Sequence, residues 1–157
     1  MSVNTASGWK VSIGPTTPAA DATAYAALTY APFGEIQSIG EFGDEAADVT
    51  FTSLSDGRVR HLKGARDAGV LALVCGHDAL DAGQIAAKAA EKTNFSYAIK
   101  IEAADALDAN DTDSVFYFHA QVQSARINPG ENDSVVTVTF NLGITTAIIE
   151  VPATVVP

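Results

Sequence analysis

The segment 49–74, VTFTSLSDGRVRHLKGARDAGVLALV, decides how the rest of the chain is interpreted. Two runs of alternating apolar residues, 49–54 and 69–75, flank a polar stretch that glycines punctuate, and such alternation predicts β-strands. The polar stretch holds four of the nine Lys and Arg residues of the chain: Arg58, Arg60, Lys63 and Arg66. No enzyme motif has this form. The pattern is typical of a connector that is mobile in one copy and becomes ordered against another, and it favours self-assembly over chemistry.

Composition predicts one folded domain that spans residues 1–157. Hydrophobic residues make up 47% of the chain and charged residues 18%, which is enough to build a core. Nineteen acidic residues against nine basic ones leave a net charge of −10, whereas a nucleic-acid-binding protein needs a basic surface. No apolar run is long enough for a signal core or a membrane span, so we expect a protein made in the cytoplasm with no membrane partner.

The remaining periodicity predicts a mainly β protein with one helix. We expect a flexible N-terminus over 1–8, a loop or extended arm over 14–27 because Pro15 and Pro18 interrupt its start, and an acidic turn over 41–48. The helix covers about 79–93 with Asp81 as its cap, and 102–113 is a solvated acidic loop. Strands are expected at 9–13, 29–40 with a bulge near Gly34, 49–54, 69–75 covered on both faces, 95–103, 114–127 and 134–142, with an edge strand before Pro152. The sum is an antiparallel sandwich or barrel with one flanking helix.

The residues predict no catalytic, metal or cofactor site. His61, His77 and His119 fall in three different segments without metal-ligand spacing, and no nucleophile elbow or phosphate-binding loop is present. We interpret His119 as a core or interface residue, and the single cysteine, Cys75, as a buried core residue. The sequence therefore indicates a protein that is not an enzyme.

The order of these segments resembles a known family. The strand VTFTSL, the Gly64-x-x-Asp67-x-Gly69 pattern of KGARDAG, the helix, and the two terminal strands that NPGEND separates are similar to the major tail tube proteins of long non-contractile-tailed (siphovirus-type) bacteriophages, over about residues 9–150. The resemblance implies a tail-tube fold and a structural virion protein whose hexameric rings stack into the tail tube, the conduit for genome delivery into the host.

It further implies tape-measure, tail-terminator and distal-tail proteins as partners, with genomic DNA passing through the tube without specific binding. The protein is expected in the virion tail after synthesis in the host bacterial cytoplasm. Some family members carry a C-terminal immunoglobulin-like domain, and none is expected here.

The resemblance maps the family's long inter-strand loop, which packs on the adjacent ring, onto residues 41–66. An acidic cluster comes first in this segment and the basic cluster follows. Our hypothesis is that the two clusters meet across subunits or rings, and it rests on Glu41, Asp44, Glu45, Asp48, Arg58, Arg60, Lys63 and Arg66. An ordinary solvated hairpin is the alternative for this segment.

Three other functions fit the same sequence. The chain is also compatible with the inner-tube protein of a contractile tail or a type VI secretion system, because similar folds occur there. A ring-forming head–tail joining or tail-terminator protein is a further option. A monomeric cytoplasmic β-sandwich that binds a ligand or protein belongs to a different class.

Overall fold

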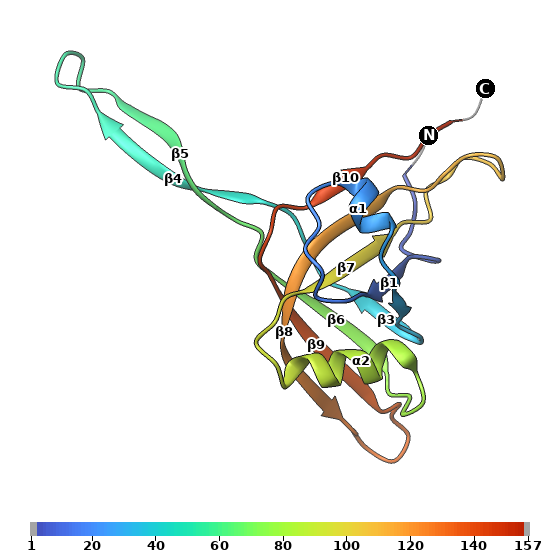
Figure 1. Cartoon of the computed structure of the whole chain (residues 1–157). Helices are drawn as coiled ribbons and strands as arrows, with labels where there is room; N and C mark the ends of the chain where they lie inside the picture. Colours follow the sequence, from blue (N-terminus) through green and yellow to red (C-terminus); the bar gives the residue numbers. More distant parts are fainter. Residues whose placement is uncertain (1–2, 156–157) are drawn as a thin grey trace.

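The computed structural model describes residues 3–155, which form mainly antiparallel β-sheet with two short helices (Figure 1). The helices are α1 (Ala22–Ala26) and α2 (Ala82–Glu91). The strands are β1 (Lys10–Ile13), β2 (Ala31–Pro32), β3 (Ile36–Ile39), β4 (Glu45–Thr52), β5 (Val59–Asp67), β6 (Val70–Gly76), β7 (Tyr97–Glu102), β8 (Val115–Asn128), β9 (Thr137–Ile144) and β10 (Ile149–Val151). Neither helix is long and apolar enough to cross a membrane, and this holds for the described residues only.

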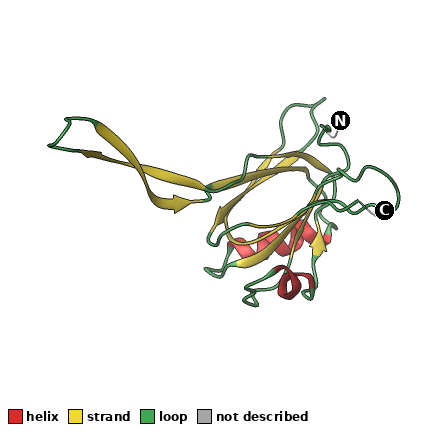
Figure 2. Ribbon diagram, turned by 90° about the horizontal axis from the view of Figure 1, so that it is seen from above, coloured by secondary structure: helices red, strands yellow, loops and turns green. Residues whose placement is uncertain are grey.

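The main sheet is closed into a barrel by one short segment of chain. Its strand order is β2-β1-β7-β8-β9-β6-β3, and the two outermost strands are joined by residues 33–35 alone. The amide of Phe33 donates to the carbonyl of Val11 at 2.9 Å on one side, and the amide of Gly76 donates to the carbonyl of Glu35 at 2.7 Å on the other. Figure 2 shows the strands curving round a common centre. The predicted antiparallel barrel with a flanking helix is confirmed.

The barrel interior is filled by the inward-facing residues of the alternating strands. Strand β6 places Leu71, Leu73 and Cys75 inward with no exposed surface, and the same cluster takes in residues of β7, β8 and β9. Helix α2 adds Ala87 and Ala90, whose small side chains let it pack closely on the barrel. The outward face of β6 is less covered than predicted, because Val70 is 53% exposed.

Asp81 ties α2 to the segment that closes the barrel. It is the N-cap of α2 and accepts from the amide of Gln84 at 3.0 Å, as predicted. The same carboxylate accepts from the amide of Gly34 at 3.1 Å. The helix also lies so close that a Cβ on Gly83 would stand 2.5 Å from the carbonyl oxygen of Pro32. One acidic side chain thus fixes both the helix start and the crossover from β2 to β3.

The structure corrects two predictions in the N-terminal third. Residues 14–27 were expected to lack helix, but α1 forms there because Asp21 caps it and Tyr25 is buried against Tyr117, with ring centroids 5.4 Å apart. Residues 29–40 were expected to form one bulged strand. They form β2 and β3 instead, because Glu35 adopts a left-handed backbone (φ 55°) and the register shifts only later, between Ile36 and Ser38.

The C-terminal half matches the predictions more closely. Strands β7, β8 and β9 fall within two or three residues of the expected ranges. The predicted edge strand is β10, which pairs antiparallel with β8 and ends before Pro152. Of the predicted flexible N-terminus, residues 1 and 2 lie outside the described residues, while Trp9 donates its backbone N–H to Ala6 at 3.2 Å.

Strands β4 and β5 form a separate two-stranded sheet that extends away from the barrel (Figure 1). The sequence predicted an acidic turn over 41–48 followed by a mobile basic connector. Both predictions were wrong in their secondary structure, since β4 already begins at Glu45 and the basic stretch is β5. The strand predicted at 49–54 is the second half of β4. Strands β4 and β5 with the turn between them, residues 45–67, are called the hairpin below.

Candidate assembly interface

The hairpin is a regular arm. Its first strand has eight residues, which at about 3.4 Å per residue span roughly 27 Å. The tip is a defined turn in which the amide of Gly57 (φ 64°) donates to the carbonyl of Ser53 at 2.8 Å and Asp56 accepts from the amide of Arg58 at 3.0 Å. The predicted turn at 55–57 is confirmed, and the strands reach well beyond the barrel that carries them.

One face of the hairpin is apolar and open to solvent. Val49 lies opposite Leu62, and Phe51 lies opposite Arg60, so these four side chains project from the same face. Val49, Phe51 and Leu62 are 46%, 55% and 57% exposed. Val49 packs closely over Gly64, since a Cβ at that position would stand only 2.7 Å from Cγ2 of Val49.

The other face of the hairpin is mainly polar. Asp48 lies opposite Lys63, and Thr50 lies opposite His61. The Nδ1 atom of His61 is 2.9 Å from an oxygen of Asp48, with both side chains well exposed. The same face also carries Val59, which is 51% exposed, so the two faces differ in polarity without either being uniform.

The structure brings some of the predicted charged residues together within one chain. Arg66 is 3.6 Å from Asp44, and Asp48 lies opposite Lys63. Arg60 pairs with Asp56, outside the predicted acidic cluster, at 2.9 Å. Exposed pairs of this kind stabilise a fold by only about 0–1 kcal/mol each. Glu41, Glu45 and Arg58 take part in none of the four ion pairs found within residues 3–155.

These charges are graded along the hairpin. Its root is mainly acidic, with Glu41, Asp44, Glu45 and Asp67 against Arg66 alone. Its distal part is mainly basic, with Arg58, Arg60 and Lys63, although Asp56 at the tip pairs with Arg60. The order of the residues separates the two clusters in the sequence, but their placement along one arm follows only from the pairing of β4 with β5.

Sequence reasoning missed the apolar face. The available signal was the alternation of Val49 and Phe51, which predicts a strand but does not distinguish a buried face from an exposed one. A strand that pairs only with its hairpin neighbour has no sheet to cover it, so alternation there marks an open apolar face.

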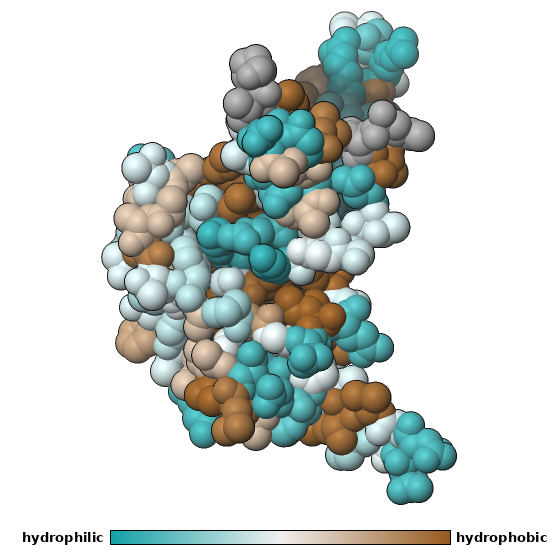
Figure 3. Space-filling model, turned by 90° about the vertical axis from the view of Figure 1, so that its right-hand side faces the viewer, coloured by the Kyte–Doolittle hydropathy of each residue, from teal (hydrophilic) through white to brown (hydrophobic). Residues whose placement is uncertain are grey.

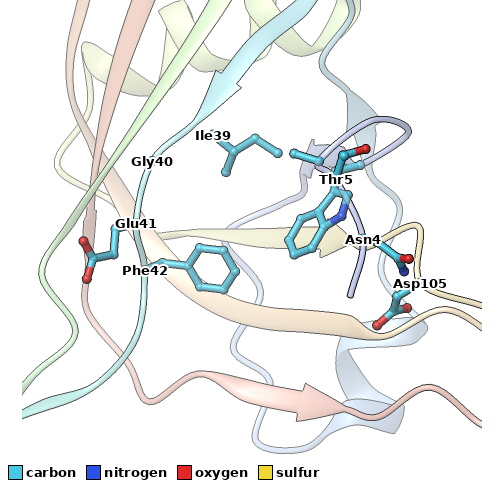
Figure 4. Close-up of a pocket in the computed structure, with 9 residues that line it drawn as sticks. Asn4, Thr5, Ile39, Gly40, Glu41, Phe42 and Asp105 are labelled. Atoms are coloured by element: carbon cyan, nitrogen blue, oxygen red, sulfur yellow. The ribbon is translucent and has the colours of Figure 1, made fainter. Parts of the chain in front are cut away.

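A groove surrounds Phe42, where the chain leaves the barrel for the hairpin. On one side is a hollow of about 500 Å³ in the mouth of the barrel, to which Trp9, Ile39 and Phe42 contribute apolar surface. Figure 4 shows Phe42 pointing into this hollow and Asp105 lying across from it. On the other side is a hollow of about 600 Å³ whose wall carries the root carboxylates of Glu41, Asp44, Glu45 and Asp67. Because the two hollows share Glu41 and Phe42, we treat them as one feature, the Phe42 groove.

Aromatic contacts hold the apolar side of this groove in place. The ring of Phe42 packs edge-on against Phe116 at 5.1 Å between centroids, and Trp9 stacks on Phe116 at 6.3 Å. A preformed surface of this kind loses little conformational freedom when a partner covers it.

His119 and Cys75, whose side chains could take part in chemistry, are part of the packing. His119 is buried, with Nδ1 2.6 Å from the hydroxyl of Tyr25 and Nε2 3.0 Å from the carbonyl oxygen of Thr17. Since a carbonyl can only accept, Nε2 donates and the Tyr25 hydroxyl donates to Nδ1. Burial raises the pKa of the Cys75 thiol to about 12, which keeps it protonated and unreactive. Within residues 3–155, no three His, Cys, Asp or Glu side chains gather closely enough to hold a metal ion.

The side of the body turned away from the hairpin has a mixed surface. In Figure 3 its apolar residues form separate patches between hydrophilic ones.

Comparison with solved structures finds proteins of similar fold. One chain of the SPP1 tail tube is similar with a TM-score of 0.64 and 15% identity, over 90% of this chain and 75% of that one. A chain of the six-fold symmetrised anti-feeding prophage baseplate is similar with a TM-score of 0.66 and 13% identity, over 97% of this chain and 98% of that one. A chain from the PVC sheath/tube terminator of an extracellular contractile injection system is similar with a TM-score of 0.68 and 12% identity, over 94% of this chain and 96% of that one.

The predicted tail-tube fold is confirmed by these similarities, which at such identities concern the fold. No family model matches the chain, and no curated protein matches its sequence.

Proposed function

We propose that this chain is a tube-forming structural protein of a phage tail or a related tail-like particle, and not an enzyme. More specifically, we propose the major tail tube protein of a long non-contractile-tailed phage. Its hexameric rings stack into the tube that conducts the genome into the host. The fold shared with a chain of the SPP1 tail tube supports this, and the six-fold symmetry of the anti-feeding prophage baseplate supports a ring of six.

The observation that carries the proposal is the exposed apolar face of the hairpin. A two-stranded hairpin is at best marginally stable alone in water, yet this one exposes Val49, Phe51 and Leu62 at a distance from the barrel. Contact with another copy covers that face. Because a projecting arm meets a different surface on its neighbour, the contact is head-to-tail, and such contacts generate rings or filaments.

The acidic composition suits a conduit for DNA. A net charge of −10 disfavours the retention of phosphates through counterion release, which requires a basic surface. DNA therefore passes without specific binding in this proposal. The partners are further copies of the chain together with tape-measure, tail-terminator and distal-tail proteins, and the assembled protein resides in the virion tail.

A second candidate is the inner-tube protein of a contractile tail or injection system. The likeness to a chain of the PVC sheath/tube terminator favours it. Co-purification with a sheath protein separates the two candidates, since a non-contractile tail has none.

Negative-stain electron microscopy of the purified protein, at low and high concentration, tests the proposal. We expect hollow tubes of stacked rings from the native chain. The charge reversal Arg58→Glu/Arg60→Glu at the hairpin tip should leave a folded monomer that forms no tubes.

The matched control is Lys92→Glu/Arg126→Glu, which adds the same negative charge to the body of the barrel. Tubes from the control but not from the hairpin variant support the proposal. A native chain that stays monomeric at every concentration favours a monomeric binding module. Equal loss of tubes in both variants assigns the effect to net charge and contradicts the role of the hairpin.

A further inference from the structure

We propose that the Phe42 groove of one copy receives the distal hairpin of a second copy. The apolar face of the hairpin lies against the barrel mouth, and Arg58 and Arg60 lie against the carboxylates at the hairpin root. This inference rests on the proposed function and names the surface that the hairpin engages.

The hairpin cannot occupy the groove of its own chain. It leaves the barrel at the groove and extends away from it (Figure 1). Its tip, the turn between Thr52 and Val59, lies an entire strand length from Glu45, the first residue of β4. The occupant with a matching surface is therefore the hairpin of another copy.

Charge is complementary between the two surfaces. The groove wall at the hairpin root carries Glu41, Asp44, Glu45 and Asp67, and of these only Asp44 is in an ion pair among residues 3–155. The distal hairpin brings Arg58 and Lys63, which are also outside the ion pairs of residues 3–155, together with Arg60, which pairs with Asp56 of its own turn. Opposite potentials of this kind guide two surfaces to one register and disfavour others.

The apolar surfaces are complementary as well. The barrel mouth offers Trp9, Ile39 and Phe42 in a hollow of about 500 Å³, which has room for one or two large side chains of a partner. Phe51 and Leu62 stand on the hairpin face that also carries Arg60. One face of the hairpin can therefore place an aromatic anchor in the mouth and a guanidinium near the carboxylates, which is the usual composition of an interface centre.

A mixing experiment tests the pairing. The hairpin variant Arg58→Glu/Arg60→Glu and the groove variant Glu41→Lys/Glu45→Lys each repel their own copies, so each alone should lose at least ten-fold of the sedimentable tubes. In an equimolar mixture, each hairpin finds a groove of opposite charge, and tubes should return. A chain with all four substitutions should also assemble. Circular dichroism melts of each variant, at concentrations below assembly, establish that the monomers are folded.

A second variant tests the apolar half without changing charge. Thr5 lines the barrel mouth and is exposed (Figure 4), so Thr5→Trp should fill the hollow and reduce assembly at least ten-fold. The matched control Asn110→Trp, in the exposed acidic loop, should assemble like the native chain.

The outcomes separate this inference from the proposed function. The inference alone is overturned if the native chain forms tubes, each double variant does not, and neither the mixture nor the combined chain restores them. The receiving surface then lies elsewhere. Normal tubes from the groove variant or from Thr5→Trp also overturn it. Failure of the native chain to assemble contradicts the proposed function itself.

Discussion

Val49 of β4 lies directly opposite Leu62 of β5, and both side chains are about half exposed at a place where the barrel cannot cover them. Apolar cross-strand pairs stabilise a hairpin, but this pair keeps one side in water. In the proposed assembly, contact with another copy removes this pair from water and so stabilises the hairpin.

Substitution of this pair should separate folding from assembly. Val49→Thr/Leu62→Thr places β-branched residues, which suit strands, at both positions and removes apolar surface from the open face. We expect an unchanged melting temperature of the monomer and at least ten-fold fewer tubes by sedimentation and electron microscopy. The control is Thr50→Val on the polar face of the same strand, which should leave assembly intact. Unchanged assembly of the double variant would show that this face stays in solvent.

Asp81 should contribute far more stability than the other helix cap. Asp81→Ala removes the acceptor for the amides of Gln84 and Gly34 and loosens the barrel closure. From typical costs for a lost cap and an unpaired partly buried amide, we expect the free energy of unfolding to fall by about 2–4 kcal/mol. Asp21→Ala, at the exposed start of α1, loses only the bond to Ala24 and should cost about 0.5–1 kcal/mol. Urea titration measures both values, and equal costs would show that the crossover does not depend on Asp81.

Cys75 should react only when the chain unfolds. Because burial raises the pKa of this thiol to about 12, the folded protein at pH 8 should be labelled by a disulfide reagent at least ~10³-fold more slowly than an unfolded thiol. A Cys75→Ala/Leu54→Cys variant places the thiol at the fully exposed tip and should react at the free rate.

The raised pKa of the Cys75 thiol also makes the folded protein less stable at high pH. The unfolded thiol ionises near pH 9 and the folded one near pH 12, so unfolding is increasingly favoured as pH rises through that window. The urea midpoint should fall between pH 9 and 12, and by less in Cys75→Ala. A midpoint that falls equally in both proteins would assign the loss to other groups, such as Tyr30, whose pKa burial also raises.

The sequence predicted those elements whose pattern is set by local chemistry. Three such features depend on residues only a few positions apart, and all three appear in the structure. They are the alternation over 69–75, the helix cap at Asp81 and the end of the last strand before Pro152. The break at 33–35 could not be predicted in this way. It depends on Gly34 and Glu35 meeting Asp81 and Gly76, which are more than 40 residues away in the chain.

The candidate interface was predicted in part. The charged residues from Glu41 to Arg66 were identified from their order in the sequence, but their arrangement along a two-stranded arm required the pairing of β4 with β5. Recognition of the apolar face required the exposed fractions of its side chains, which periodicity does not report. Alternation at Val49 and Phe51 has the same form whether the apolar side faces a core or a neighbouring molecule.

The position of the hairpin on one side of the barrel has a consequence for growth. An assembly joined through hairpins and grooves has two different ends, since one terminus presents unoccupied arms and the other presents unfilled grooves. A protein that starts such an assembly and a protein that stops it must therefore have opposite shapes and opposite charges. A protein that binds the groove end must offer a basic projection, and one that binds the arm end must offer an acidic recess, so neither can substitute for the other.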